Sequence, residues 1–119
     1  MDAYLDTFNA RDPDAFAATL AEPSFRIDRL GGVAVFETRA AYADQLRASF
    51  ADLPWHHSLY DAKEIVQQGP RKAHVKVRFT RYAEDGRALS THDSLYLVTC
   101  TEGRWGIVVR SSFVPIKGP

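Results

Sequence analysis

The chain has 119 residues, 45% of them hydrophobic, which is the size of one ordinary domain with a core large enough to stabilise it. Fifteen basic and fifteen acidic residues cancel, so the general attraction of a basic protein to nucleic acids or anionic membranes is missing. Cys100 is the only cysteine, which excludes a disulfide within these 119 residues. We predict a single domain over residues 1–119, with no nucleic-acid or membrane partner.

The N-terminal segment predicts two short helices. Tyr4 and Phe8 recur at helical spacing. The pair Asp12-Pro13 is typical of an N-cap followed by a proline in the first helical turn, and this second helix must end before Pro23. The amphipathic start has no signal-peptide pattern, and no apolar run approaches the ~20 residues of a membrane span, so we expect a cytoplasmic protein.

The next segment predicts a hairpin and a third helix. Residues 24–36, SFRIDRLGGVAVF, alternate in hydrophobicity around a turn at Gly31-Gly32. Thr38 is a suitable N-cap for a helix that ends at Pro54. Its apolar stripe consists of Tyr42, Leu46, Phe50 and Leu53.

The C-terminal half predicts long strands only, at residues 55–68, 71–82, 88–101 and 104–114. Helices followed by a run of strands indicate an α+β fold, in which three N-terminal helices cover one face of a curved antiparallel sheet. Lys72, His74, Lys76 and Arg78 should form a solvated strand face over a buried face of Ala73, Val75, Val77 and Phe79.

Asp93 stands in an apolar strand. Alternation places it on one face with Leu89, Thr91, Leu95 and Leu97. Because burying an ionised carboxylate costs several kcal/mol, we predict that Asp93 lines a pocket and is neutral or paired there. The opposite face is also apolar, with Tyr96, Val98, Cys100 and Val108. We therefore expect a second subunit to cover it, giving a homodimer.

The order helix, helix, hairpin, helix and long strands resembles the cone-shaped nuclear transport factor 2-like (NTF2-like) superfamily over nearly the whole chain. This superfamily includes SnoaL-like cyclases, limonene epoxide hydrolase, scytalone dehydratase and ketosteroid isomerase. The most specific match is to ketosteroid isomerase, through YLDTFNARDPDAFAATLAEPSFRID at residues 4–28. The resemblance implies that Tyr4 is a catalytic tyrosine, Asp28 the general base, and Asp93 a second acid of the oxyanion hole.

These roles agree with the chemistry of proton transfer next to a carbonyl. Such a reaction needs a carboxylate base, here Asp28, and hydrogen-bond donors to the developing oxyanion, here Tyr4 and protonated Asp93. Two of these residues also have a purely structural interpretation. Tyr4 fits a core aromatic residue, and Asp28 fits a cap of the hairpin turn.

The predicted ligand-binding residues are apolar or aromatic side chains expected to face the cone: Phe25, Phe50, Trp55, His57, Leu95, Trp105 and Val109. His56 and His57 are adjacent in a strand and should point to opposite faces, so we predict no metal site. We also predict no cofactor.

Together these features predict a pocket for a small hydrophobic carbonyl compound. If the protein is an enzyme, the resemblance favours cofactor-free isomerase, cyclase or dehydratase-type chemistry. Two other functions fit the same fold: a non-catalytic ligand carrier, and a protein-interaction module whose sheet recruits a partner. A hydratase or an epoxide hydrolase is a further alternative within the fold.

Overall fold

The structure, a computed structural model, describes residues 2–50 and 55–114. Within these residues the helices are α1 (Asp2–Asn9), α2 (Pro13–Ala17) and α3 (Arg39–Phe50). The strands are β1 (Leu20–Ile27), β2 (Val33–Phe36), β3 (His57–Gln68), β4 (Lys72–Tyr82), β5 (Ala88–Thr101) and β6 (Arg104–Ser112). No described helix is long and apolar enough to cross a membrane.

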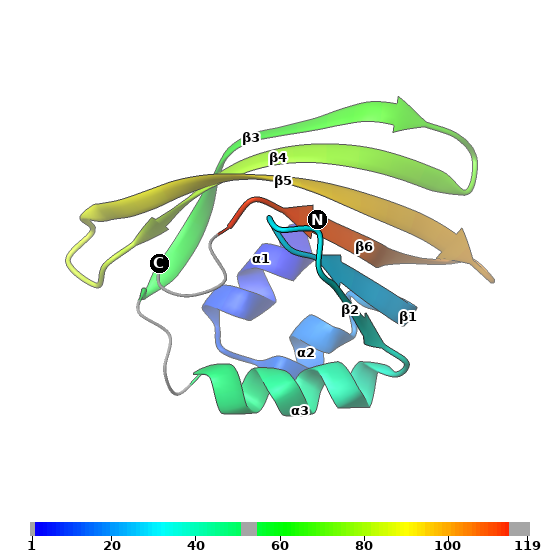
Figure 1. Cartoon of the computed structure of the whole chain (residues 1–119), viewed down its shortest axis with the longest axis horizontal. Helices are drawn as coiled ribbons and strands as arrows, with labels where there is room; N and C mark the ends of the chain where they lie inside the picture. The colour runs from blue at the N-terminus through cyan, green and yellow to red at the C-terminus, as the bar shows by residue number, and fades with distance from the viewer. Residues whose placement is uncertain (1, 51–54, 115–119) are drawn as a thin grey trace.

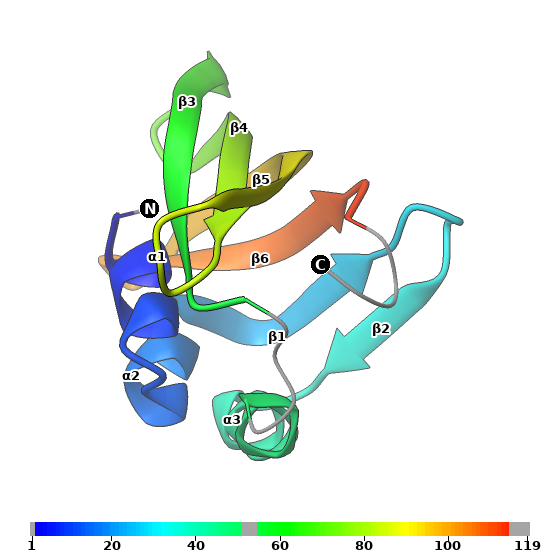
Figure 2. The same cartoon turned by 90° about the vertical axis from the view of Figure 1, so that its left-hand side faces the viewer.

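The strands form one curved sheet in the order β2-β1-β6-β5-β4-β3, and its concave face bends over the helices (Figure 1). Figure 2 shows the same arrangement from the side, with α1, α2 and α3 together beneath the sheet. The predicted α+β fold is confirmed. The sheet is mixed, however, because β1 pairs with β6 in parallel, whereas the other neighbouring pairs are antiparallel.

Side-chain caps begin the second and third helices. Asp12 accepts a hydrogen bond from the Ala15 backbone amide at 3.1 Å, and Thr38 accepts one from Ala41 at 3.1 Å. The predicted second helix was too long, since α2 ends at Ala17 and Leu20 already belongs to β1.

The core lies between the helices and the concave face of the sheet. Its buried apolar side chains are Tyr4, Phe16, Leu20, Tyr42, Leu46, Val75, Val77, Phe79, Tyr96 and Ile107. Asn9 fixes α1 to β3, because its side-chain amide donates to the Ser58 carbonyl at 2.7 Å and accepts from the Ser58 amide at 2.9 Å. These two hydrogen bonds hold the end of α1 against β3.

The face assignment predicted for β5 is wrong. Tyr96 is 2% exposed and points to the concave side, whereas Leu95 is 38% exposed on the convex side. The reason lies in the packing, because the Tyr96 ring fits edge-on against the ring of Tyr4 in α1, with 5.3 Å between the ring centres. A register shift between Leu97 and Val98 then changes which residues of β6 face inward.

Candidate functional site

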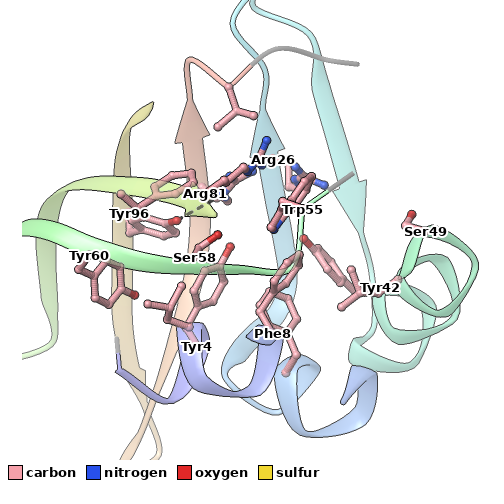
Figure 3. A pocket seen from close by; sticks show the side chains of 16 residues that line it. Tyr4, Phe8, Arg26, Tyr42, Ser49, Trp55, Ser58, Tyr60, Arg81 and Tyr96 are labelled. Atoms are coloured by element: carbon pink, nitrogen blue, oxygen red, sulfur yellow. Dashed lines mark hydrogen bonds between the residues drawn. The ribbon is translucent and has the colours of Figure 1, made fainter. Parts of the chain in front are cut away.

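A cavity of about 290 Å³ lies between the helices and the concave face of the sheet (Figure 3). Its apolar wall includes Leu5, Phe8, Phe16, Leu46, Phe79 and Val114. Its polar groups include the hydroxyls of Tyr4, Tyr42 and Tyr96 and the guanidinium groups of Arg26, Arg81 and Arg110. No aspartate or glutamate among the described residues lines it. The size and the mixture of groups suit a small organic molecule.

Arg81 is a buried cation that has no acidic partner within residues 2–50 and 55–114. It is 6% exposed, and its guanidinium carbon lies 3.7 Å from the centre of the Trp55 ring. Its Nε and Nη1 atoms are buried and have no hydrogen-bond partner, and the same is true of Trp55 Nε1. Burial, and then the charges of Arg110 and Arg26, lower the pKa of Arg81 to about 10. Arg81 therefore stays charged at neutral pH while its donors remain unused.

Two further arginines converge on the same cavity from neighbouring strands. Arg26 in β1 lies directly opposite Arg110 in β6, and like charges in this position repel each other. Arg110 Nε donates to the Tyr96 hydroxyl at 3.4 Å. Burial opposes the charge of Arg110, but the tyrosines around it outweigh burial, and the pKa of Arg110 lies above its ordinary value.

Among the residues that the structure describes, no acidic side chain pairs with any of the three pocket arginines. The ion pairs of the described residues join other arginines to acids and include none of these three. The concave side of the sheet therefore carries a cluster of positive charge that no described acidic residue compensates, and we call Arg26, Arg81 and Arg110 the arginine cluster. Such a cluster can hold an anion by charge-assisted hydrogen bonds.

Tyr4 lies in the wall of the cavity, as expected from the sequence. It is 9% exposed, and its ring centre lies 4.6 Å from that of Phe16. Burial, and then Tyr96, raise the pKa of Tyr4 well above its ordinary value. The hydroxyl consequently remains a hydrogen-bond donor at neutral pH. Its catalytic role stays a prediction.

Asp93 lies on the convex side of the sheet, so its predicted location in the pocket is wrong. Its side chain is 52% exposed, and its Oδ1 accepts a hydrogen bond from Arg78 Nε at 3.0 Å. This hydrogen bond is the main reason why the pKa of Asp93 lies below its ordinary value. Asp93 is therefore an ionised, paired surface carboxylate in the protomer, and not a protonated donor in the cavity.

Asp28 caps the turn between β1 and β2. Its Oδ1 accepts hydrogen bonds from the backbone amides of Leu30 and Gly32, both at 2.9 Å. The side chain also borders a second cavity of about 340 Å³, which shares Arg26 and Arg110 with the first. The three predicted catalytic residues thus do not come together: Tyr4 lines the first cavity, Asp28 the second and Asp93 neither.

Of the seven predicted ligand-binding residues, Trp55 alone lines the first cavity. Three of the others lie on the convex face because the strand faces were inverted: Phe25, Leu95 and Val109. The remaining three lie elsewhere in the fold: Phe50, His57 and Trp105. His57 stacks on Tyr82 at 5.2 Å and Trp105 is 49% exposed. Phe50 contacts Phe8 with 5.3 Å between ring centres.

The predicted orientation of the adjacent histidines is also wrong. His56 precedes β3 and is not part of its alternation, so its Nδ1 lies 3.0 Å from Nδ1 of His57. No group of three metal-ligating side chains occurs within the described ranges.

Sequence reasoning missed the arginine cluster. For Arg81 a signal was present, because the alternation that buries Val75, Val77 and Phe79 continues to Arg81 on the same face. For Arg110 the signal was hidden, since the register shift beside Leu97 reverses the parity of β6.

A curved sheet with helices and a cavity under its concave face defines a protein of the NTF2-like class. The chain belongs to the family described as NTF2-like protein (DUF6841), whose sequence model matches residues 1–112. No curated protein matches the chain by sequence.

Solved structures share this fold at low sequence identity. A protein of unknown function with a cystatin-like fold from Nostoc punctiforme is 16% identical, with a TM-score of 0.79 over 99% of this chain and 87% of that one. A ketosteroid isomerase-like protein from Erwinia carotovora atroseptica is 22% identical, with a TM-score of 0.73 over 98% and 91%. An NTF-2 like protein of unknown function from Shewanella oneidensis is 19% identical, with a TM-score of 0.70 over 94% and 91%. These similarities show the fold.

Proposed function

We propose that this protein binds a small organic anion with an apolar body in the cavity under its sheet. The observation that carries the proposal is Arg81, a buried arginine with two unused donor atoms and, in the described part of the chain, no acid beside it. A buried, unpaired charge is costly, and a site that only packed the core would be more stable with an apolar residue there. An anionic ligand supplies the missing partner.

The walls of the cavity suit an apolar or aromatic body. Phe8 and Trp55 stack with their ring planes 8° apart, and Tyr4, Phe16 and Tyr42 form a connected group of rings beside them. Aromatic side chains contribute a large apolar contact area with few rotatable bonds. The hydroxyls of Tyr4 and Tyr96 add donors near the arginine cluster.

Phenylacetate and its neutral amide, phenylacetamide, test this function. Phenylacetate should raise the melting temperature and bind in calorimetry, whereas phenylacetamide should not, because only the carboxylate pairs with Arg81. Arg81→Met should weaken phenylacetate binding by about tenfold to a hundredfold, the loss of a charge-assisted hydrogen bond. Arg78→Met is the matched control, since Arg78 lies on the convex face. Equal binding of the acid and the amide would contradict the proposal.

Cofactor-free proton transfer is a second candidate. It is favoured by the fact that the cavity of Asp28 adjoins that of Tyr4 and shares two arginines with it. Here an anionic substrate would be held by the arginines while the carboxylate of Asp28 removes a proton. Asp28→Asn distinguishes the two functions. A carrier should keep its affinity for the ligand, whereas an enzyme that uses Asp28 as its base should lose turnover.

The convex face supports the proposal of a homodimer. Its apolar patch spans four strands and consists of Phe25, Ile27, Val33, Val35, Leu95, Leu97 and Val109. This convex patch replaces the set that the sequence suggested, since Tyr96 points inward. A second copy is the favoured partner because the pair Arg78–Asp93 beside the patch carries both charges and can be self-complementary across a two-fold axis.

Leu95→Glu tests the dimer. A carboxylate in the convex patch should convert a dimer into a monomer, because it would be buried without a partner. Light scattering at micromolar concentration measures this directly. Ile65→Glu is the control, since Ile65 is exposed but belongs to the other face of the sheet. A wild-type monomer would remove the proposal.

A further inference from the structure

We infer that the anion carries a doubly charged head group, as in a phosphate monoester, attached to an apolar body. This inference rests on the proposed function and specifies its ligand class. Its geometric basis is the number and direction of the unused donors and the position of Arg26 and Arg110, which line both cavities.

The unused donors of Arg81 point in different directions. Nε and Nη1 lie on different edges of the planar guanidinium group, so one planar carboxylate pairs with one of these edges at a time. Trp55 Nε1 adds a third buried donor without a partner in the same wall. A tetrahedral head group presents three oxygens in different directions, which matches donors arranged in this way.

The charge of the cluster also exceeds that of a single carboxylate. Arg26 and Arg110 lie opposite one another on the neighbouring strands β1 and β6. Burial is the largest cause that lowers the pKa of Arg81, and the charges of Arg110 and Arg26 lower it further. The guanidinium groups are therefore close enough to repel each other. No acidic residue of the described chain lines the first cavity, so a monoanion leaves most of this repulsion uncompensated.

The second cavity gives the head group room. Arg26 and Arg110 separate it from the first cavity, and its polar lining includes Gln45 and Ser112. An oxygen of the head group can lie between these two arginines while the apolar body remains among the rings of the first cavity. The single acid of this lining, Asp28, has one oxygen engaged by two backbone amides.

Phenyl phosphate and phenyl sulfate form a matched pair for the test, because both have a tetrahedral head on the same ring and differ in charge. The second pKa of a phosphate monoester is about 6, so phenyl phosphate is largely a dianion at pH 7.5. Calorimetry with the full chain at pH 7.5 should show phenyl phosphate binding at least about tenfold more tightly than phenyl sulfate. Lowering the pH to 5 should remove this difference.

Arg26→Met should reduce the advantage of phenyl phosphate over phenyl sulfate to less than about threefold, whereas Arg78→Met should leave it unchanged. Inorganic phosphate should bind more weakly than phenyl phosphate, because it lacks the apolar body. Equal affinity for phenyl phosphate and phenyl sulfate would overturn the doubly charged head group, while binding of phenylacetate would still support an anion site. If none of these aromatic anions binds, the proposed function itself fails.

Discussion

Replacing Phe16 with alanine is expected to lower the free energy of unfolding by about 3–5 kcal/mol, the usual cost of removing a fully buried phenylalanine. Phe16 is 1% exposed, and its ring centre lies 4.6 Å from that of Tyr4, 5.4 Å from that of Phe8 and 5.7 Å from that of Tyr42. These partners come from α1 and α3, so the ring of α2 joins all three helices. The resulting space would also open into the first cavity, because Phe16 forms part of its wall.

Urea denaturation measures this loss. Phe113→Ala removes the same atoms from a residue that is 72% exposed, and it should change the free energy of unfolding by less than about 0.5 kcal/mol. A loss below about 1 kcal/mol for Phe16→Ala would mean that the helices reposition to fill the space, and that the described packing does not control stability.

Local signals in the sequence predicted most of the elements, although not the end of α2 or the start of β1. Asp12 and Thr38 begin helices where the capping pattern placed them, and β5 covers the predicted residues 88–101. Each of these features depends on a few neighbouring residues. The parallel pairing of β1 with β6 depends instead on a contact between the two ends of the chain, and no local pattern records it.

The candidate site was harder to predict because it depends on the direction of each strand face. In β5 both faces contain apolar residues, so alternation alone could not decide whether Tyr96 or Leu95 points inward. Because the two faces of β5 were assigned the wrong way round, Asp93 was expected in the pocket but lies on the convex surface. The faces of β1 were also assigned the wrong way round, so Phe25 was expected to line the cavity, whereas Arg26 lines it.

Under the proposed function, Arg81 has opposite effects on stability and on binding. Without a ligand, its buried charge and unused donors destabilise the folded state, and they are compensated only in part by stacking on Trp55. In the proposed complex, the same groups would donate charge-assisted hydrogen bonds to the anion. Sites selected for function commonly retain such a stability cost.

Arg81→Met is accordingly expected to raise the melting temperature of the ligand-free protein while it removes stabilisation by phenylacetate. We expect a gain of about 1 kcal/mol, or roughly 4 °C for a domain of this size, because methionine fills similar space against Trp55 without an unpaired charge. The pKa of Arg81 is lowered to about 10 in the folded state, below the ordinary value of a free arginine, chiefly because the side chain is buried. The unfolded chain therefore binds this proton more tightly, and the cost to wild type is fully present below pH 10 and decreases as the pH rises above it. Denaturation of both proteins at pH 7 and pH 10.5 should show that the difference in stability is smaller at the higher pH.

A variant less stable than wild type at pH 7 would show that Arg81 stabilises the core through its stacking on Trp55, and would weaken the case for an anion site.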